Sequence, residues 1–194
     1  MNEQSVRPGR KRSEESRQAI LVATLELTAE LGYAGLTIEG IAARSGAGKQ
    51  TIYRWWPSKA DVLLEALAIK ADVVVSLPDK GSYAADLRHF VVASFALAAR
   101  HPVADALRAL MAQAQLDPEF RKRFWAAFLQ RRRDALRVLI DRAAARGDLP
   151  AGASADTVID AVFGIVWYRL LTDRPPDEQL ADELVTLISG RTSP

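Results

Sequence analysis

The sequence predicts an all-α protein of about nine helices, with a small amino-terminal head of three helices and a larger helical body. Apolar residues recur at spacings of three and four through most of the 194 residues. Capping residues, glycine and proline separate these segments at intervals typical of helices. With 49% hydrophobic residues, the chain has enough apolar surface to form a substantial core.

The polar segment at residues 1–12 is predicted to be a disordered basic arm. It carries Arg10 and Arg12 close together. Such an arm can follow the minor groove or the phosphates of DNA. A solvated tail fits the same composition, and both interpretations stay open.

Residues 13–57 are predicted to form three short helices. Ser13 is a suitable cap for the first, and Gly32 is expected to end it. Thr37 can cap the second helix with its hydroxyl group. Lys49 to Trp55 should form the third.

The turn between the second and third helices carries the most specific signal in the chain. Ala42 is small where two steeply crossing helices touch, Gly46 can adopt a positive φ, and Ile52 is a branched apolar anchor. This spacing indicates a helix-turn-helix, whose second helix enters the major groove of DNA.

Residues 58–194 are predicted to form the body, and residues 58–77 should connect it to the head. Composition alone would favour a strand at 73–75, but the helical pattern continues through it. Asp117 followed by Pro118 is a strong helix start. Beyond the connection, helices are expected at about 83–100, 102–115, 118–146 and 154–171, and a last one ending at Ile188.

The first 60 residues resemble the DNA-binding head of the TetR family of bacterial transcriptional regulators. Two departures are Gly48, where the family commonly has serine, and Gln50, where it commonly has glycine. The bulky pair at 55–56 is also unusual, and we expect Trp56 in the core of the head with Trp55 partly exposed. The matching segments are Ile20–Thr24, Leu31–Tyr33, Leu36–Ile38, Ile41–Ala42, Thr51–Tyr53 and Pro57–Lys59.

Candidate DNA contacts lie at the amino end of the third helix and around it. Gln50 can pair with adenine, Lys49 with guanine or phosphate, and Thr51 with a thymine methyl group. Helix amino ends also favour phosphate. A solvated polar face is the alternative for all of them. The predicted contacts are Arg10, Arg12, Thr37, Lys49, Gln50, Thr51, Tyr53, Arg54 and Lys59.

Charge supports nucleic acid binding only mildly, because the net charge is +2 and residues 1–60 hold 9 Lys and Arg against 6 Asp and Glu. No phosphate-loop, nucleophile or metal-ligand pattern is complete. We therefore expect no enzyme activity, no metal and no cofactor. The absence of cysteine and of a long apolar segment favours a cytoplasmic protein without a membrane partner.

The resemblance implies a small-molecule cavity in the body, lined by residues that otherwise look like core. An apolar or aromatic effector follows from their chemistry. The predicted lining residues are Phe95, Trp125, Phe128 and Trp167. The cluster at 131–133 holds three consecutive arginines, which fan around a helix, so at least one side chain is expected to approach the core or a partner. A solvated face whose aliphatic stems pack is the preferred interpretation.

The resemblance also implies a homodimer formed by the last two helices, which would let two heads bind a palindromic operator. The predicted interface residues are Val158, Val162, Ile165, Leu184, Leu187 and Ile188. The sequence thus predicts a homodimeric repressor released from double-stranded DNA by an effector. An activator or co-repressor-dependent regulator, or a helical ligand-binding protein with vestigial DNA binding, remains the alternative.

Overall fold

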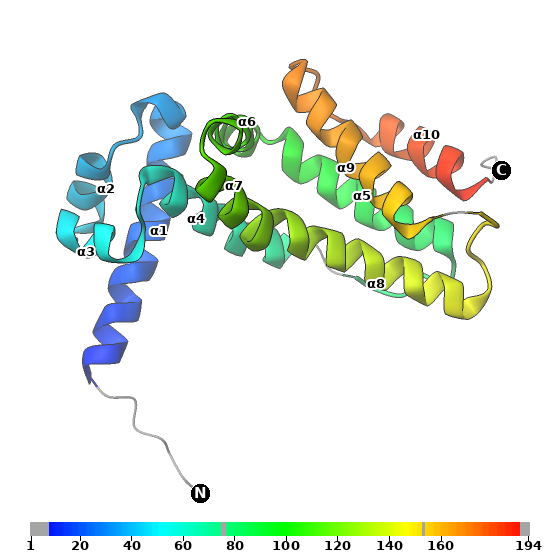
Figure 1. The fold of residues 1–194 in the computed structure, drawn as a ribbon, viewed down its shortest axis with the longest axis horizontal. Helices are drawn as coiled ribbons and strands as arrows, with labels where there is room; N and C mark the ends of the chain where they lie inside the picture. The colour runs from blue at the N-terminus through cyan, green and yellow to red at the C-terminus, as the bar shows by residue number, and fades with distance from the viewer. Residues whose placement is uncertain (1–7, 75–76, 153, 191–194) are drawn as a thin grey trace, which may run out of the picture. The chain divides into compact units, whose positions relative to one another are not determined.

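The computed structural model describes residues 8–74, 77–152 and 154–190; the side chains of 8–12 and 71–74 lie outside this description. Every regular element in these ranges is helical, which confirms the all-α prediction (Figure 1). They form nine helices if the continuous run of α7, η1 and α8 counts as one. The chain divides into two compact units between Leu67 and Ala68, inside α4.

The first unit holds α1 (Pro8–Gly35), α2 (Ile38–Ser45), α3 (Lys49–Trp55) and the beginning of α4 (Lys59–Val74). The prediction that disorder extends to residue 12 is wrong for residues 8–12, because α1 begins at Pro8 rather than at Ser13. The side chains of Arg10 and Arg12 fall outside the described residues.

The predicted roles of Gly32, Thr37 and Gly46 are confirmed, whereas Ser13 lies inside α1 and does not cap it. Gly32 interrupts α1 with a φ of 66°, a conformation that glycine adopts without strain. The hydroxyl group of Thr37 accepts the amide hydrogen of Gly40 at 3.0 Å and so caps α2. Gly46 ends α2 with a φ of 70°, whereas Gly48 precedes α3 without a side-chain cap.

A compact core joins the helices of the head. Ile20 of α1, Ile41 of α2 and Ile52 of α3 are fully buried. Trp56 is also buried, and its indole nitrogen donates to Glu65 at 2.8 Å. Trp55 is only partly exposed, so both expectations for the tryptophan pair are confirmed.

An arginine fixes α2 against α1. The guanidinium group of Arg44 donates to both carboxylate oxygens of Glu30, at 2.9 and 2.8 Å, and approaches Glu26 at 3.4 Å. This hydrogen bond holds the pKa of Glu30 below its ordinary value. The bidentate geometry orients the helix that precedes the turn.

The second unit is built around α5, which packs against α8, α9 and α10 (Figure 1). Leu87, Phe90 and Val91 of α5 are buried in its core. No single helix in the described ranges qualifies as a membrane span, and α5 with α6 qualifies only as a pair bent by 87°. The helices that lie wholly within the second unit are α5 (Tyr83–Ala99), α6 (His101–Leu116), α7 (Pro118–Phe124), η1 (Trp125–Leu129), α8 (Gln130–Arg146), α9 (Ala155–Leu171) and α10 (Glu178–Ser189).

The predicted long helix at 118–146 is present but carries an unexpected π-turn. Asp117 caps its start by accepting the amide hydrogens of Glu119 and Phe120 at 2.9 and 3.0 Å. The turn η1 then widens the helix over five residues. Such π-turns rotate the side chains that follow and are frequent at functional sites.

A buried carboxylate ties the carboxyl end of α8 to the start of α5. Asp86 accepts from Arg142 at 3.0 Å, from Arg146 at 2.9 Å and from the backbone amide of Lys80 at 2.6 Å. Burial raises the pKa of Asp86, but these donors outweigh it and leave the pKa below its ordinary value. The ionised carboxylate is therefore part of the folded state.

Candidate nucleic acid interface and ligand cavity

The third helix presents a polar face to solvent because its apolar anchor points inward. Ile52 is buried, whereas Lys49, Gln50, Tyr53 and Arg54 are exposed. These four side chains make up most of the solvent-exposed surface of α3. Thr51, also predicted as a contact, is partly buried.

Two of these residues already have partners within the head. The ammonium group of Lys49 lies 2.9 Å from a carboxylate oxygen of Glu39 on α2. This hydrogen bond raises the pKa of Lys49 and lowers the pKa of Glu39. The guanidinium group of Arg54 lies 5.3 Å from the ring centre of Trp55, which restricts its direction.

Lys59 binds the chain itself, a role that the sequence analysis missed. Its ammonium group donates to the backbone carbonyls of Tyr33 at 3.0 Å and Leu36 at 2.8 Å. It also lies 4.4 Å from the ring centre of Tyr33. Both carbonyls follow the break at Gly32, and that of Tyr33 also accepts the amide hydrogen of Leu36 at 3.3 Å. Lys59 therefore adds a charged donor at the end of the first helix.

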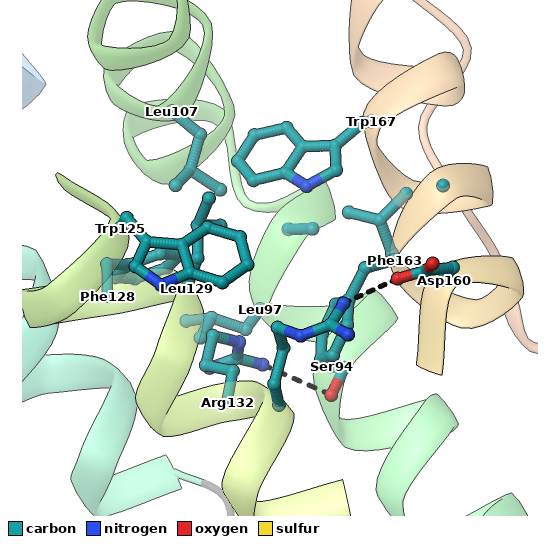
Figure 2. A pocket seen from close by; sticks show the side chains of 14 residues that line it. Ser94, Leu97, Leu107, Trp125, Phe128, Leu129, Arg132, Asp160, Phe163 and Trp167 are labelled. Carbon is teal, nitrogen blue, oxygen red and sulfur yellow. Dashed lines mark hydrogen bonds and ion pairs between the residues drawn. The ribbon is translucent and has the colours of Figure 1, made fainter. Parts of the chain in front are cut away.

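A cavity of about 270 Å³ lies among the helices of the body (Figure 2). Three of the four predicted effector-pocket residues, Trp125, Phe128 and Trp167, line it. Phe95 does not line it and is 1% exposed, because its side chain is part of the core. The remaining lining residues are Ser94, Leu97, Ala98, Leu107, Leu129, Arg132, Arg133, Asp160, Phe163, Gly164 and Val166.

The π-turn helps to supply this lining. Trp125, Phe128 and Leu129 belong to η1, and Arg132 and Arg133 follow in the first turn of α8. Aromatic contacts fix the turn, since the rings of Phe124 and Phe128 stack at 5.8 Å between centroids. Sequence periodicity could not locate this turn, because it assumes a uniform helical pitch.

Two arginines of the cluster at 131–133 enter the cavity wall, so the interpretation as a solvated face is wrong for them. Arg132 donates to the hydroxyl group of Ser94 on α5 at 3.1 Å (Figure 2). Arg133 pairs with Asp160 on α9 and lies 5.6 Å from the ring centre of Trp125. Arg131 remains exposed.

A larger hollow of about 610 Å³ lies beside the carboxyl end of α9. Its central arginine, Arg108, donates to the backbone carbonyl of Leu170 at 2.9 Å and to Asp105 and Asp173. The exposed side chain of Leu171 lies at its edge. Charged groups that pair with each other make this hollow a less suitable ligand site than the aromatic cavity.

Three of the six predicted interface residues face the core of their own chain. Val158, Val162 and Leu184 are buried, because their spacing along α9 and α10 follows the inward face. Ile165 and Ile188 are partly exposed. Leu187 is 80% exposed.

The sequence analysis also missed two exposed apolar residues of α9. Tyr168 is 61% exposed and Leu171 is 74% exposed. They stand three residues apart and hence on neighbouring positions of one helical face. A pattern of apolar residues alone does not distinguish an inward face from an outward one when both faces are apolar.

The described residues contain no group of three or more His, Asp or Glu side chains arranged to hold a metal ion. The two histidines lie on separate helices, and His101 on α6 lies 3.5 Å from Asp105.

Family comparisons cover both units. A model described as "Bacterial regulatory proteins, tetR family" matches residues 20–66. A model described as "Tetracyclin repressor-like, C-terminal domain" matches residues 77–188, more than half of the chain. The match to the head includes the turn and the recognition helix.

Individual proteins are similar over almost their whole lengths. The HTH-type transcriptional regulator YdeS of Bacillus subtilis is 30% identical over 94% of this chain and 92% of its own. AqdR of Rhodococcus erythropolis, also an HTH-type transcriptional regulator, is 28% identical over 89% of this chain and 83% of its own.

Solved structures show the same fold. The TetR family transcription regulator SCO0332 has a TM-score of 0.79 at 30% identity, covering 93% of this chain and 100% of that chain. The regulator FadR from Bacillus subtilis, solved in complex with stearoyl-CoA, has a TM-score of 0.69 at 21% identity, covering 90% and 99%.

Proposed function

The chain belongs to the TetR family of bacterial transcriptional regulators, and we propose that it is a homodimeric repressor released from a palindromic operator by a small-molecule effector. Regulators of this family bind DNA and are not enzymes. One observation supports the proposal above all others: a single chain combines an exposed recognition face on α3 with an aromatic cavity in a separate unit.

Specific DNA recognition would begin with Gln50, which can form two hydrogen bonds with an adenine edge. Lys49 would bond guanine or phosphate, and Tyr53 and Arg54 would contact the backbone. One bidentate pair contributes ~1–3 kcal/mol of discrimination between bases. We keep Arg10, Arg12, Thr37 and Thr51 as further proposed contacts, with Thr37 acting through the amino end of α2.

A dimer would allow two heads to bind two half-sites. Each head alone offers few base contacts, whereas a twofold pair reads a palindrome with half-sites ~34 Å apart. The exposed apolar side chains of α9 and α10, including Tyr168 and Leu187, support an interface on these helices. The partly exposed Ile165 and Ile188 would add to it.

Effector control would act through a shift between two conformations. A ligand in the cavity would favour one position of α4. Residues 59–67 of this helix belong to the first unit, and residues 68–74 belong to the second. A coupling free energy of ~1–3 kcal/mol would weaken operator binding ~5–150-fold.

The FadR structure with stearoyl-CoA shows that a protein of this fold binds a thioester of coenzyme A. A cavity of about 270 Å³ is smaller than the ~300–1,000 Å³ that drug-sized ligands usually occupy. An entire acyl-CoA molecule is much larger still. We therefore propose a compact effector for this chain, held within the body.

The test is recovery of genomic DNA fragments by the purified protein at moderate salt, followed by a reporter assay on the recovered promoters. The proposal predicts a palindromic motif and a rise in expression when the gene is deleted. Gln50→Ala should relax or abolish the motif, and Gln115→Ala, at an exposed position of α6, is the matched control. A fall in expression on deletion would identify an activator, and no enriched motif at any salt would contradict the proposal.

A further inference from the structure

We propose that the cavity of the body selects a flat, uncharged aromatic molecule that carries an N–H or O–H group. Its ring lies against the backbone of α9 at Gly164, and its polar hydrogen is donated to Asp160. This inference rests on the proposed effector role of the cavity and adds the chemical class of the ligand. It also identifies Gly164 as the residue that determines which ligand shapes the cavity accepts.

Gly164 leaves part of the cavity wall without a side chain. It belongs to the lining and lies in the interior of α9, where its backbone is ordinary helix. Glycine at such a position destabilises a helix relative to alanine. Beyond its own turns of helix, a Cβ atom added here would meet no atom of the described chain within 4 Å. Packing inside the chain therefore does not require this glycine, and we assign the open space to a ligand.

The surfaces near Gly164 suit a flat ring. Trp167 stands three residues later on α9 and hence on a neighbouring position of the same face. Trp167 and Trp125 reach the cavity from α9 and η1, so indole rings border it from two elements (Figure 2). The volume of about 270 Å³ admits two fused rings. Contacts between aromatic rings add to the gain from burying apolar surface.

Asp160 supplies a hydrogen-bond acceptor at the mouth of the cavity, where its side chain is 69% exposed. Its oxygen Oδ1 accepts from Arg133 of α8 at 2.5 Å, which restrains the carboxylate (Figure 2). Within the part of the chain that the structure describes, no group donates a hydrogen bond to the second oxygen, Oδ2. Asp160 lies four residues before Gly164, so it stands beside the same open stretch of α9.

The ion pair of Asp160 with Arg133 favours an uncharged ligand group at this place. A carboxylate on the ligand would be repelled by Asp160, and an ammonium group would be repelled by Arg133. A neutral N–H or O–H group avoids both repulsions and still forms a charge-assisted hydrogen bond with Oδ2. Because Asp160 is largely exposed, water competes for this bond and the expected gain in affinity is moderate.

The experiment compares two pairs of probes by calorimetry on the full-length protein. Indole and benzofuran have nearly the same shape, but only indole has an N–H donor. 2-Naphthol and decahydro-2-naphthol both carry a hydroxyl group, but only 2-naphthol is flat. We expect indole to bind about fivefold more tightly than benzofuran. We expect 2-naphthol to bind about tenfold more tightly than its saturated analogue.

Asp160→Asn tests the acceptor. It keeps an oxygen for Arg133 and places an NH₂ group where Oδ2 lies, so it should remove the preference for indole over benzofuran. Asp156→Asn is the matched control, because Asp156 lies one turn earlier on α9, also approaches Arg133 at 3.4 Å and is not part of the lining. It should leave the preference unchanged.

Gly164→Leu tests the open space. Its side chain should occupy that space and weaken the binding of indole and of 2-naphthol about tenfold or more. Gly164→Ala should cause a smaller loss and should unfold at the same or a higher temperature, because alanine favours the helix. Thr157→Leu is the control, since Thr157 is exposed on the same face of α9, two turns earlier and outside the lining.

Equal affinity for indole and benzofuran would overturn the inference, as would tighter binding of 2-naphthoate than of 2-naphthol. Failure of all the probes to bind at millimolar concentration would overturn it too. If Gly164→Leu bound the probes normally but sedimented as a monomer where the wild-type protein is a dimer, the glycine would serve contact with a second copy. That result would also contradict the inference.

The proposed repressor function would survive each of these results if the protein still bound an operator and another ligand released it. Absence of operator binding would instead contradict the proposed function while leaving the binding of the probes measurable.

Discussion

The ammonium group of Lys49 lies 2.9 Å from a carboxylate oxygen of Glu39, so the lysine that opens the recognition helix is paired with an acid of the preceding helix. Both side chains are more than half exposed, and salt screens such a pair. A phosphate that approached Lys49 would have to compete with Glu39, whose own charge repels DNA.

Glu39→Gln should therefore strengthen DNA binding. We expect a gain of about two- to fivefold at low salt on unrelated DNA, which fades as salt rises. Fluorescence anisotropy against salt concentration measures it. Glu119→Gln on α7 breaks an equally exposed pair, with Lys122 at 2.8 Å, in the other unit and should have little effect. Weaker binding by Glu39→Gln would show that the pair instead holds Lys49 ready for DNA.

Lys59→Met should destabilise the head, because two backbone carbonyls lose a charged donor. Hydrogen bonds of this kind contribute about 1–2 kcal/mol, and urea unfolding would detect the loss. Lys59→Arg, which keeps donors, should recover part of it. We expect the salt dependence of DNA binding to stay unchanged in the folded variant. A decrease of about one in the salt slope would show that Lys59 also contacts a phosphate.

The head was predictable because its signals are local. Thr37 and Gly46 each act through backbone geometry within a few residues, and the burial of Ile52 follows from helical spacing. The resemblance to a known family then indicated which face of α3 would contact DNA. The hydrogen bonds from Lys59 to the backbone were missed because their acceptors, the carbonyls of Tyr33 and Leu36, lie more than twenty residues earlier in the sequence.

The body was predictable in its helices but not in its faces. The resemblance implied a cavity lined by four aromatic residues, and three of them line the one observed, whereas Phe95 has the same chemistry and is part of the core. The roles of Arg132 and Arg133 depend on a π-turn and on partners in α5 and α9. The predicted interface residue Val162 is buried in its own chain, and the local pattern does not say which helix covers it.

Asp86→Asn should lower the free energy of unfolding by about 2–3 kcal/mol. Removing the charge leaves Arg142 and Arg146 without their buried carboxylate. Because both arginine side chains are partly exposed to water, the cost is smaller than is usual for breaking a buried ion pair. Chemical denaturation at neutral pH measures the change. A loss below about 0.5 kcal/mol would contradict this role.

The same carboxylate predicts how stability depends on pH. The pKa of Asp86 is lower in the folded protein than its ordinary value of 3.8, so its stabilising contribution is complete above that value. It is lost as the pH falls from about 4 through the lower pKa of the folded state. Denaturation curves between about pH 2 and 5 should show a shallower acid dependence for Asp86→Asn than for the wild-type protein.

Leu187→Glu should weaken the proposed dimer, because it places a charge on an exposed apolar position of α10. Leu116→Glu on α6 is a matched control, since Leu187 is 80% and Leu116 82% exposed. Sedimentation at several concentrations should show monomers for the first variant and dimers for the second. If both variants sediment like the wild-type protein, the interface lies elsewhere.

The most direct test of a dimer that reads two half-sites is the affinity for a recovered operator into which five base pairs are inserted between the half-sites. This insertion turns the half-sites to opposite faces of the duplex, since a helical turn is about 10 base pairs. For the five-base-pair insertion we predict a loss of about a hundredfold or more in affinity. A ten-base-pair insertion returns the half-sites to the same face but moves them one helical turn further apart, so only a flexible dimer would regain most of the affinity. Unchanged affinity with the five-base-pair insertion would contradict a dimer that holds two recognition helices at a fixed spacing.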